Sequence, residues 1–304
     1  MPGEIAMRKT VFILLIGALL FCLAASEGFA QGPPINTDSP IVLGLSGRAV
    51  RTFGKLIRIP SLRQDGEKIT DPDDSKVTVW VTPLAIPYNV TDRLQVAGIF
   101  PFVNASLRTR TQRLSNFGLS DIQFFAKYVW YQADGKNKTF RIASRVDLKL
   151  PTSDEKETPA LGTGSTDFAF STVAGWIENR VGVYLEGGYG LNTSNGGVNY
   201  GNSFLYNLAL GYRVVPVVYE TYPSPQLNAF LELNGNTTAR SAVNALENPN
   251  SGGTTIYLSP GLQYIGGRLW LVEGSFQYPI VNNPNGTQLA TAWTASLGVR
   301  LLLY

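Results

Sequence analysis

The segment between Thr139 and Leu150 alternates apolar and polar residues with a period of two. Successive side chains of a β-strand point to opposite faces, so this segment predicts a strand with one apolar face and one ionic face. The ionic face carries Arg141, Arg145, Asp147 and Lys149. The same alternation recurs along most of the chain and predicts an all-β protein.

Twelve segments carry the alternation, and the connections between them are in turn short and long. Outer-membrane barrels have an even number of strands, short periplasmic turns and longer outer loops. The pattern therefore favours a transmembrane up-and-down antiparallel β-barrel of about 12 strands with both ends of the barrel chain on the periplasmic side. The predicted strands lie near residues 47–60, 76–88, 93–104, 118–131, 138–151, 164–177, 180–192, 202–215, 225–235, 254–265, 267–279 and 288–303.

If lipid covers the apolar face of these strands, the charged face points into the lumen. An Arg or Lys that faces lipid at the bilayer midplane costs about 2–4 kcal/mol. Reversing the 138–151 strand would thus cost a sum comparable with a typical folding free energy of about 5–15 kcal/mol. The predicted lumen-facing charged residues are Asp121, Lys127, Arg141, Arg145, Asp147, Lys149, Glu186, Arg213, Glu232, Glu273 and Arg300.

The basic residues of the 138–151 strand and Lys127 allow two interpretations. They could bias a narrow lumen toward anions, or they could pair with Glu186, Asp147 or Asp121 and hold the lumen together. The alternation alone does not choose between the two.

The first 30 residues are typical of a secretion signal. A basic start, Arg8-Lys9, precedes an apolar run, and Gly28-Phe29-Ala30 is a small-residue cleavage pattern. We expect the signal peptide (1–30) to be removed, with a retained anchor as the alternative. Residues 31–46, rich in Pro and Gly, are expected to form a periplasmic lead-in with little structure of its own. The barrel is expected over 47–304.

Composition narrows the remaining choices. No second apolar run approaches the roughly 20 residues of a spanning helix. In lipid only helices and closed barrels satisfy all backbone groups, so a membrane protein with this sequence must be a barrel. The alternative is a soluble secreted β-sandwich.

The chain offers few residues for catalysis. It contains no histidine, and its one cysteine, Cys22, lies in the predicted signal. The missing histidine removes Ser-His and Asp-His catalysis, and together with the missing cysteines it removes the usual transition-metal ligand sets. Carboxylate pairs remain, with Glu186, Glu232 and Glu273 as inward candidates, but lumen polarity and ion pairing explain these residues as well. We therefore expect no enzyme activity, no cofactor and no metal site. The net charge of +3 is small and scattered, and gives no reason to expect nucleic-acid binding.

Several short motifs resemble those of one outer-membrane family, named "Putative MetA-pathway of phenol degradation", best between about Tyr88 and Tyr212. The resemblance implies a Gram-negative outer-membrane barrel associated with small, often aromatic or hydrophobic, solutes. Two features depart from the family pattern: Ser153 stands where Gly usually follows Pro-Thr, and the segment through Arg58 matches poorly. The motifs are Val90-Thr91-Asp92-Arg93-Leu94, Phe100-Pro101, Gly118-Leu119-Ser120-Asp121, Ala126-Lys127-Tyr128, Leu148-Lys149-Leu150-Pro151-Thr152 and Leu161-Gly162-Thr163-Gly164-Ser165-Thr166-Asp167.

Together these features predict an outer-membrane channel or transporter for passive or facilitated passage of a small solute. The alternative is a non-transporting structural or surface-recognition barrel, similar to an adhesin. The expected partners are outer-membrane lipids, the solute and the barrel assembly machinery. For the last, Tyr304 supplies the usual terminal aromatic residue, although it shares the parity of Arg300 rather than that of Leu303.

Overall fold

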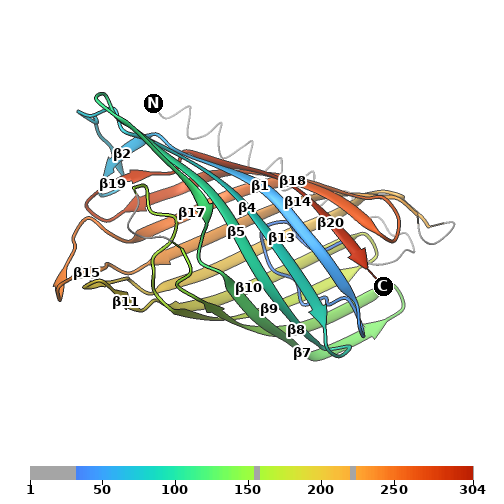
Figure 1. Ribbon diagram of the computed structural model, residues 1–304. Coiled ribbons are helices and arrows are strands. Elements are labelled where there is room, and N and C mark those ends of the chain that lie inside the picture. The colour runs from blue at the N-terminus through green and yellow to red at the C-terminus, as the bar shows by residue number, and fades with distance from the viewer. Residues whose placement is uncertain (1–31, 154–157, 220–223, 304) are drawn as a thin grey trace, which may run out of the picture.

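The protein is a closed antiparallel barrel (Figure 1), seen in a computed structural model that describes residues 32–153, 158–219 and 224–303. Thirteen strands form the wall sheet, and an additional pairing between β4 and β5 closes it. Two of these strands, β6 (Arg113–Leu119) and β7 (Gln123–Gly135), pair with the same neighbour, β5 (Leu94–Arg108). They share one position in the wall, so the barrel has 12 positions, as predicted.

The other wall strands follow the predicted order, each hydrogen-bonded to its neighbours in antiparallel register. They are β1 (Arg48–Ile59), β4 (Lys76–Asn89), β8 (Lys138–Lys149), β9 (Asp167–Glu178), β10 (Val181–Leu191), β13 (Ser203–Val215), β14 (Gln226–Thr238), β17 (Gly253–Ile265), β18 (Trp270–Pro284) and β20 (Trp293–Leu303).

Two small sheets extend from the long-connection end of the barrel. They contain the strands β11 (Ser194–Asn195), β12 (Val198–Asn199), β15 (Ala242–Val243) and β16 (Leu246–Glu247), and the strands β2 (Ser61–Gln64), β3 (Glu67–Lys68) and β19 (Thr287–Ala290). Among the described residues, no helix is long and apolar enough to cross a bilayer.

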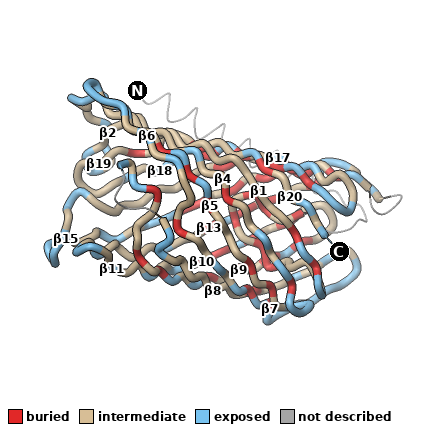
Figure 2. Tube along the Cα trace, viewed as in Figure 1, coloured by how far each residue is buried: buried red, intermediate tan, exposed pale blue. Residues whose placement is uncertain are grey.

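Side chains of the predicted apolar face of each strand point out of the barrel. Leu185 is 62% exposed and Leu297 67%, while their neighbours of the opposite parity are mostly buried. Figure 2 shows buried and exposed positions in alternation along the wall. Contiguous exposed apolar surface on this scale marks a membrane-facing region. The structure therefore agrees with an outer-membrane barrel whose charged parity faces inward.

Three expectations about the chain differ from the structure. The first part of the strand expected over 288–303 belongs to an outer sheet as β19, and the wall strand β20 begins only at Trp293. The strand expected over 118–131 is interrupted at residues 120–122, and its outer part, β6, lies in a segment expected to be a loop. Residues 32–46, expected to be a lead-in with little structure, instead lie inside the barrel, because their backbone N–H groups bind carboxylates of the inner wall. The signal peptide and Tyr304 lie outside the described residues.

Substituting an outward-facing leucine tests where the lipid lies. Leu185→Arg places a charge near the middle of β10 and is expected to destabilise the barrel by about 2–4 kcal/mol in lipid vesicles. Leu246→Arg is the control, because Leu246 is 76% exposed but belongs to an outer sheet. Urea unfolding in vesicles measures both, and equal stabilities would contradict lipid contact at Leu185.

Candidate functional site

The N-terminal segment, residues 32–46, crosses the lumen and is anchored to Glu232 of β14. The backbone N–H groups of Ile35, Asn36 and Thr37 donate to the Glu232 carboxylate at 3.0, 3.1 and 2.7 Å. The Thr37 hydroxyl donates to the same carboxylate at 2.7 Å. Buried backbone N–H groups need acceptors. This segment contains several prolines and forms no strand, and it finds its acceptors on the inner wall.

Asp38 forms the second anchor. Its backbone N–H donates to Glu186 Oε2 at 2.9 Å, and its carboxylate pairs with the Lys127 ammonium at 2.5 Å and with the Arg145 guanidinium at 3.6 Å. Lys127 also donates to the Ser39 carbonyl at 3.1 Å. The segment thus brings a carboxylate to two cations that the wall directs inward.

A third charged group lies on the adjoining part of the wall. The Glu273 carboxylate pairs with Arg51 at 2.8 Å and with Arg300 at 3.4 Å, and it accepts a hydrogen bond from Gln263 at 2.9 Å. Arg51 in turn donates to the carbonyl of Ile35 at 3.0 Å. Wall ion pairs and the N-terminal segment therefore form one connected network.

Apolar contacts hold the rest of the segment. Ile41 packs against a buried cluster of Ile177, Tyr184 and Ala209. Val42 packs against a second cluster, formed by Val129, Ala143 and Val173. Both clusters lie toward the short-turn end of the barrel, where β9 and β10 are joined. The segment therefore also packs against the inner wall at the short-turn end of the lumen.

The barrel wall itself is interrupted at Ser120–Ile122. On the side away from β5, β7 pairs with β8, but no described strand pairs with β6 on that side. Residues 158–166 cover this edge: the Asn116 amide donates to the Pro159 carbonyl at 3.2 Å, and the Ser120 hydroxyl donates to the Leu161 carbonyl at 2.5 Å. We call this boundary between β6 and residues 158–166 the seam.

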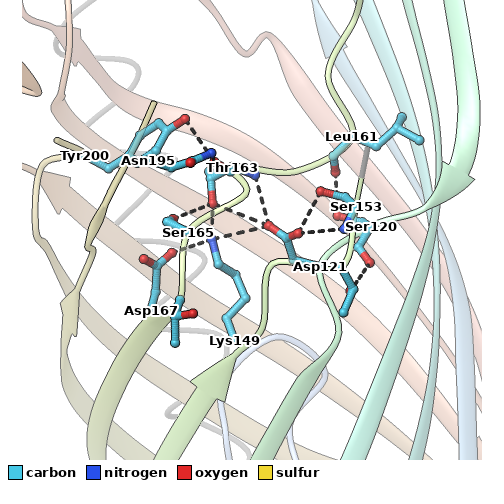
Figure 3. A network of polar contacts seen from close by, with 12 residues as sticks. Ser120, Asp121, Lys149, Ser153, Leu161, Thr163, Ser165, Asp167, Asn195 and Tyr200 are labelled. Carbon is cyan, nitrogen blue, oxygen red and sulfur yellow. Dashed lines mark hydrogen bonds and ion pairs between the residues drawn. The ribbon is translucent and has the colours of Figure 1, made fainter. Parts of the chain in front are cut away.

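Asp121 holds the seam closed (Figure 3). Its carboxylate accepts hydrogen bonds from the N–H of Ser153 at 3.1 Å and the N–H of Thr163 at 3.0 Å. It also lies 3.5 Å from the ammonium of Lys149, which pairs with Asp167 as well. A Cβ at Gly162 would lie 2.2 Å from Ser153 Oγ and 2.5 Å from Asp121 Oδ2, so a larger residue there would displace these two side chains.

The described residues enclose a larger and a smaller cavity in the lumen. The larger, of about 690 Å³, is lined by apolar side chains that include Ile41, Phe53, Ile99 and Phe125, together with the paired charges near Arg145. The smaller, of about 420 Å³, lies beside β1, β14 and β18. Ile35 and Asn36 line both cavities, so the N-terminal segment borders both.

The structure shows that most of the predicted lumen charges already have partners. Arg145 pairs with Asp147 at 2.5 Å and lies 3.9 Å from the ring of Phe125. At the periplasmic end Arg141 pairs with Asp134 at 3.2 Å, and the fully buried Arg213 donates to the Pro216 carbonyl at 3.1 Å. The predicted basic cluster is therefore a set of ion pairs rather than an open positive surface.

The sequence reasoning did not find the role of Asn36, Thr37 and Asp38. Four polar residues, Asn36 to Ser39, lie between the prolines of this segment. In such a polar run the backbone N–H groups need acceptors and Asp38 needs a cation. The predicted inward carboxylates and ammonium groups could supply both. The prolines and glycines of the segment instead suggested a segment without fixed contacts.

Two solved structures resemble the barrel. An outer membrane channel from Pseudomonas putida F1 has 14% sequence identity over 89% of this chain and 100% of that chain, with a TM-score of 0.70. The beta domain of the Bordetella autotransporter BrkA has 13% identity over 84% of this chain and 98% of that chain, with a TM-score of 0.50. At these identities the likeness shows the fold, and neither neighbour is described as an enzyme.

The family described as "Putative MetA-pathway of phenol degradation" matches residues 71–295. No curated protein matches the chain. The matched range contains the seam and most of the wall, and it leaves out the N-terminal segment.

Removing the Glu232 carboxylate is expected to release the N-terminal segment. Hydrogen bonds to charged groups contribute about 1.5–3 kcal/mol each, so Glu232→Ala should weaken docking by about 3 kcal/mol or more. In an Ile35→Cys background, thiol labelling should then become at least about 100-fold faster. Glu247→Ala, in an outer hairpin, is the control. Unchanged labelling in Glu232→Ala would contradict the anchoring role.

Asp38 gives the docked segment a defined pH dependence. Burial acts to raise the pKa of its carboxyl, but the Lys127 ammonium and the Arg145 guanidinium outweigh it and lower the pKa to about 2. A lowered pKa contributes stability that is fully present above the usual value near 3.8 and is lost as pH falls through about 2.

The difference in single-channel conductance between wild type and Asp38→Asn reports this contribution. We expect the difference to be constant from about pH 7 to pH 5, because Asp38 stays ionised throughout that range. It should shrink below about pH 4 and vanish only below about pH 2, where the Asp38 carboxyl becomes fully protonated. A difference that disappears already near pH 5 would contradict the assigned ion pairs.

Proposed function

Because the chain belongs to the "Putative MetA-pathway of phenol degradation" family and forms an outer-membrane channel-like barrel, we propose that it passes a small aromatic or otherwise apolar solute across the outer membrane. The solute uses the larger lumen cavity, which the N-terminal segment narrows. The barrel is the rigid part of this device, and the segment and the seam are the parts that can move.

The composition of the larger cavity supports an apolar solute. Phe53, Ile99 and Phe125 project into it, and the prolines Pro83 and Pro87 of β4 add two further apolar surfaces. Ligand sites for such molecules are mostly apolar, with a few placed polar groups. The ion pairs around Arg145 are the polar groups here.

The ion pairs of the lumen argue against an anion-selective pore. Selective anion passage needs cations that face the lumen with their charge available to the passing ion. Lys127, Arg145 and Lys149 instead each contact at least one carboxylate. The structural interpretation of the basic cluster is thus the better supported of the two.

A non-transporting surface-recognition barrel is the second candidate. The outer sheet of β11, β12, β15 and β16 presents the exposed apolar side chains of Val243 and Leu246 away from the membrane. A partner could bind there without any passage through the lumen. The experiment below separates the two candidates.

A variant that fills the larger cavity tests transport directly. Ile99→Trp adds bulk at the cavity wall and is expected to slow uptake of a labelled small aromatic compound in a deletion strain that carries the variant. Leu246→Trp, in the outer sheet, should leave uptake at the wild-type rate. If Ile99→Trp takes up the compound at the wild-type rate, or if wild type restores no uptake to the deletion strain, the transport proposal is wrong.

A further inference from the structure

Four basic side chains lie at the outer end of adjacent wall strands: Arg58 on β1, Lys76 on β4, Arg108 on β5 and Arg113 on β6. The strand registers place Lys76 opposite Arg108, and Arg108 opposite Arg113. Three cations therefore form one row across three strands. Arg58 lies one row closer to the membrane, opposite Thr78, to whose hydroxyl it donates a hydrogen bond. We call these four residues the outer basic belt.

The belt faces out of the barrel. Residues at paired positions of neighbouring strands lie on the same face of a sheet. On β5, Arg108 shares the parity of Phe102, which is 43% exposed, whereas Ile99, of the opposite parity, lines the lumen cavity. On β4, Lys76 shares the parity of the exposed Trp80. The belt thus belongs to the surface that meets lipid, not to the lumen.

Trp80 gives the depth of the belt in the membrane. Aromatic residues concentrate at the two membrane interfaces of a barrel. Lys76 lies four residues beyond Trp80, and at about 3.3 Å per residue along a strand tilted by about 40° the row lies about 10 Å farther out. Because the longer loops of such barrels are on the outer side, this is the headgroup level of the outer leaflet.

The charge of Arg108 and Arg113 is available for a ligand. Within the part of the chain that the structure describes, no hydrogen bond or ion pair engages the guanidinium groups of Arg108 and Arg113, and both residues are exposed. Lys76 contacts Asp74 at 3.0 Å. At this end of the barrel, no other described wall strand carries an outward-facing charged residue.

We propose that the outer basic belt binds the phosphate groups of lipopolysaccharide, the phosphorylated glycolipid of the Gram-negative outer leaflet. Guanidinium groups bind phosphate oxygens in a bidentate manner, and the exposed row presents two of them side by side. Arg113 of the belt belongs to β6, and the edge of β6 that faces away from β5 forms the seam. Bound lipid would therefore brace the outer hairpin of β5 and β6 beside the least regular part of the wall.

The test measures binding of lipopolysaccharide to the purified full-length barrel in detergent by native mass spectrometry. A cation near an anionic membrane surface contributes about 1 kcal/mol, or about fivefold in affinity. Arg108→Ser with Arg113→Ser should therefore weaken binding about 25-fold. The matched control, Arg93→Ser with Lys138→Ser, removes two exposed cations from the periplasmic end and should bind as wild type does.

Three further probes identify the chemistry. Dephosphorylated lipopolysaccharide should bind wild type about as weakly as intact lipopolysaccharide binds the belt variant. Phosphatidylglycerol and inorganic phosphate, each at the concentration of the glycolipid, should not displace it. Equal binding of the dephosphorylated form, or displacement by phosphatidylglycerol or phosphate, would overturn the assignment.

Heat-modifiable gel migration checks that each variant folds. The single variant Arg113→Ser changes only the end of the exposed hairpin and should still lose about fivefold in affinity. Binding by either belt variant at the wild-type affinity would overturn the proposal.

Discussion

The structure depends on one constraint: in hydrocarbon, every backbone N–H and C=O must be bonded within the protein, and charged side chains must point away from the lipid. A closed antiparallel barrel meets the first requirement, and a period of two along each strand meets the second. The two requirements together fix the register, because a slip by one residue would exchange the two faces. Lys127 and Arg145 face inward for this reason.

Charges that are forced inward need partners in a confined lumen, since an unpaired buried charge is strongly destabilising. The wall supplies some of these partners itself, as in the contacts of Glu273 with Arg51 and Arg300. Others come from outside the wall: the N-terminal segment brings Asp38 to Lys127, and its N–H groups to Glu232. The contacts that pair these buried charges also hold the N-terminal segment in the lumen, where it narrows the passage.

The sequence pattern was sufficient to predict the strands of the barrel wall. It was not sufficient to predict the N-terminal segment that occupies the lumen. Alternation along β8 and β10 predicted strand and face together, because lipid penalises every exception. The sequence pattern did not indicate the break at Ser120–Ile122, because the residues on both sides of it alternate. The tertiary contacts of Asp121 show why the strand stops there. The stretch around Gly162 does not alternate, yet the backbone N–H of Thr163 within it binds the carboxylate of Asp121. The segment before β1 obeys no periodicity, so its contacts could not be predicted from pattern.

The alternation of environments along β10 tests the central claim most directly. Spin labels placed one at a time at residues 182 to 189, in lipid vesicles, report collision with oxygen, which dissolves in hydrocarbon. Labels at Val183, Leu185 and Tyr189 should collide frequently with oxygen, and labels at Tyr184 and Glu186 rarely. Equal oxygen collision rates at all positions, or frequent collision with a water-soluble reagent at Leu185, would contradict a barrel whose apolar face meets lipid.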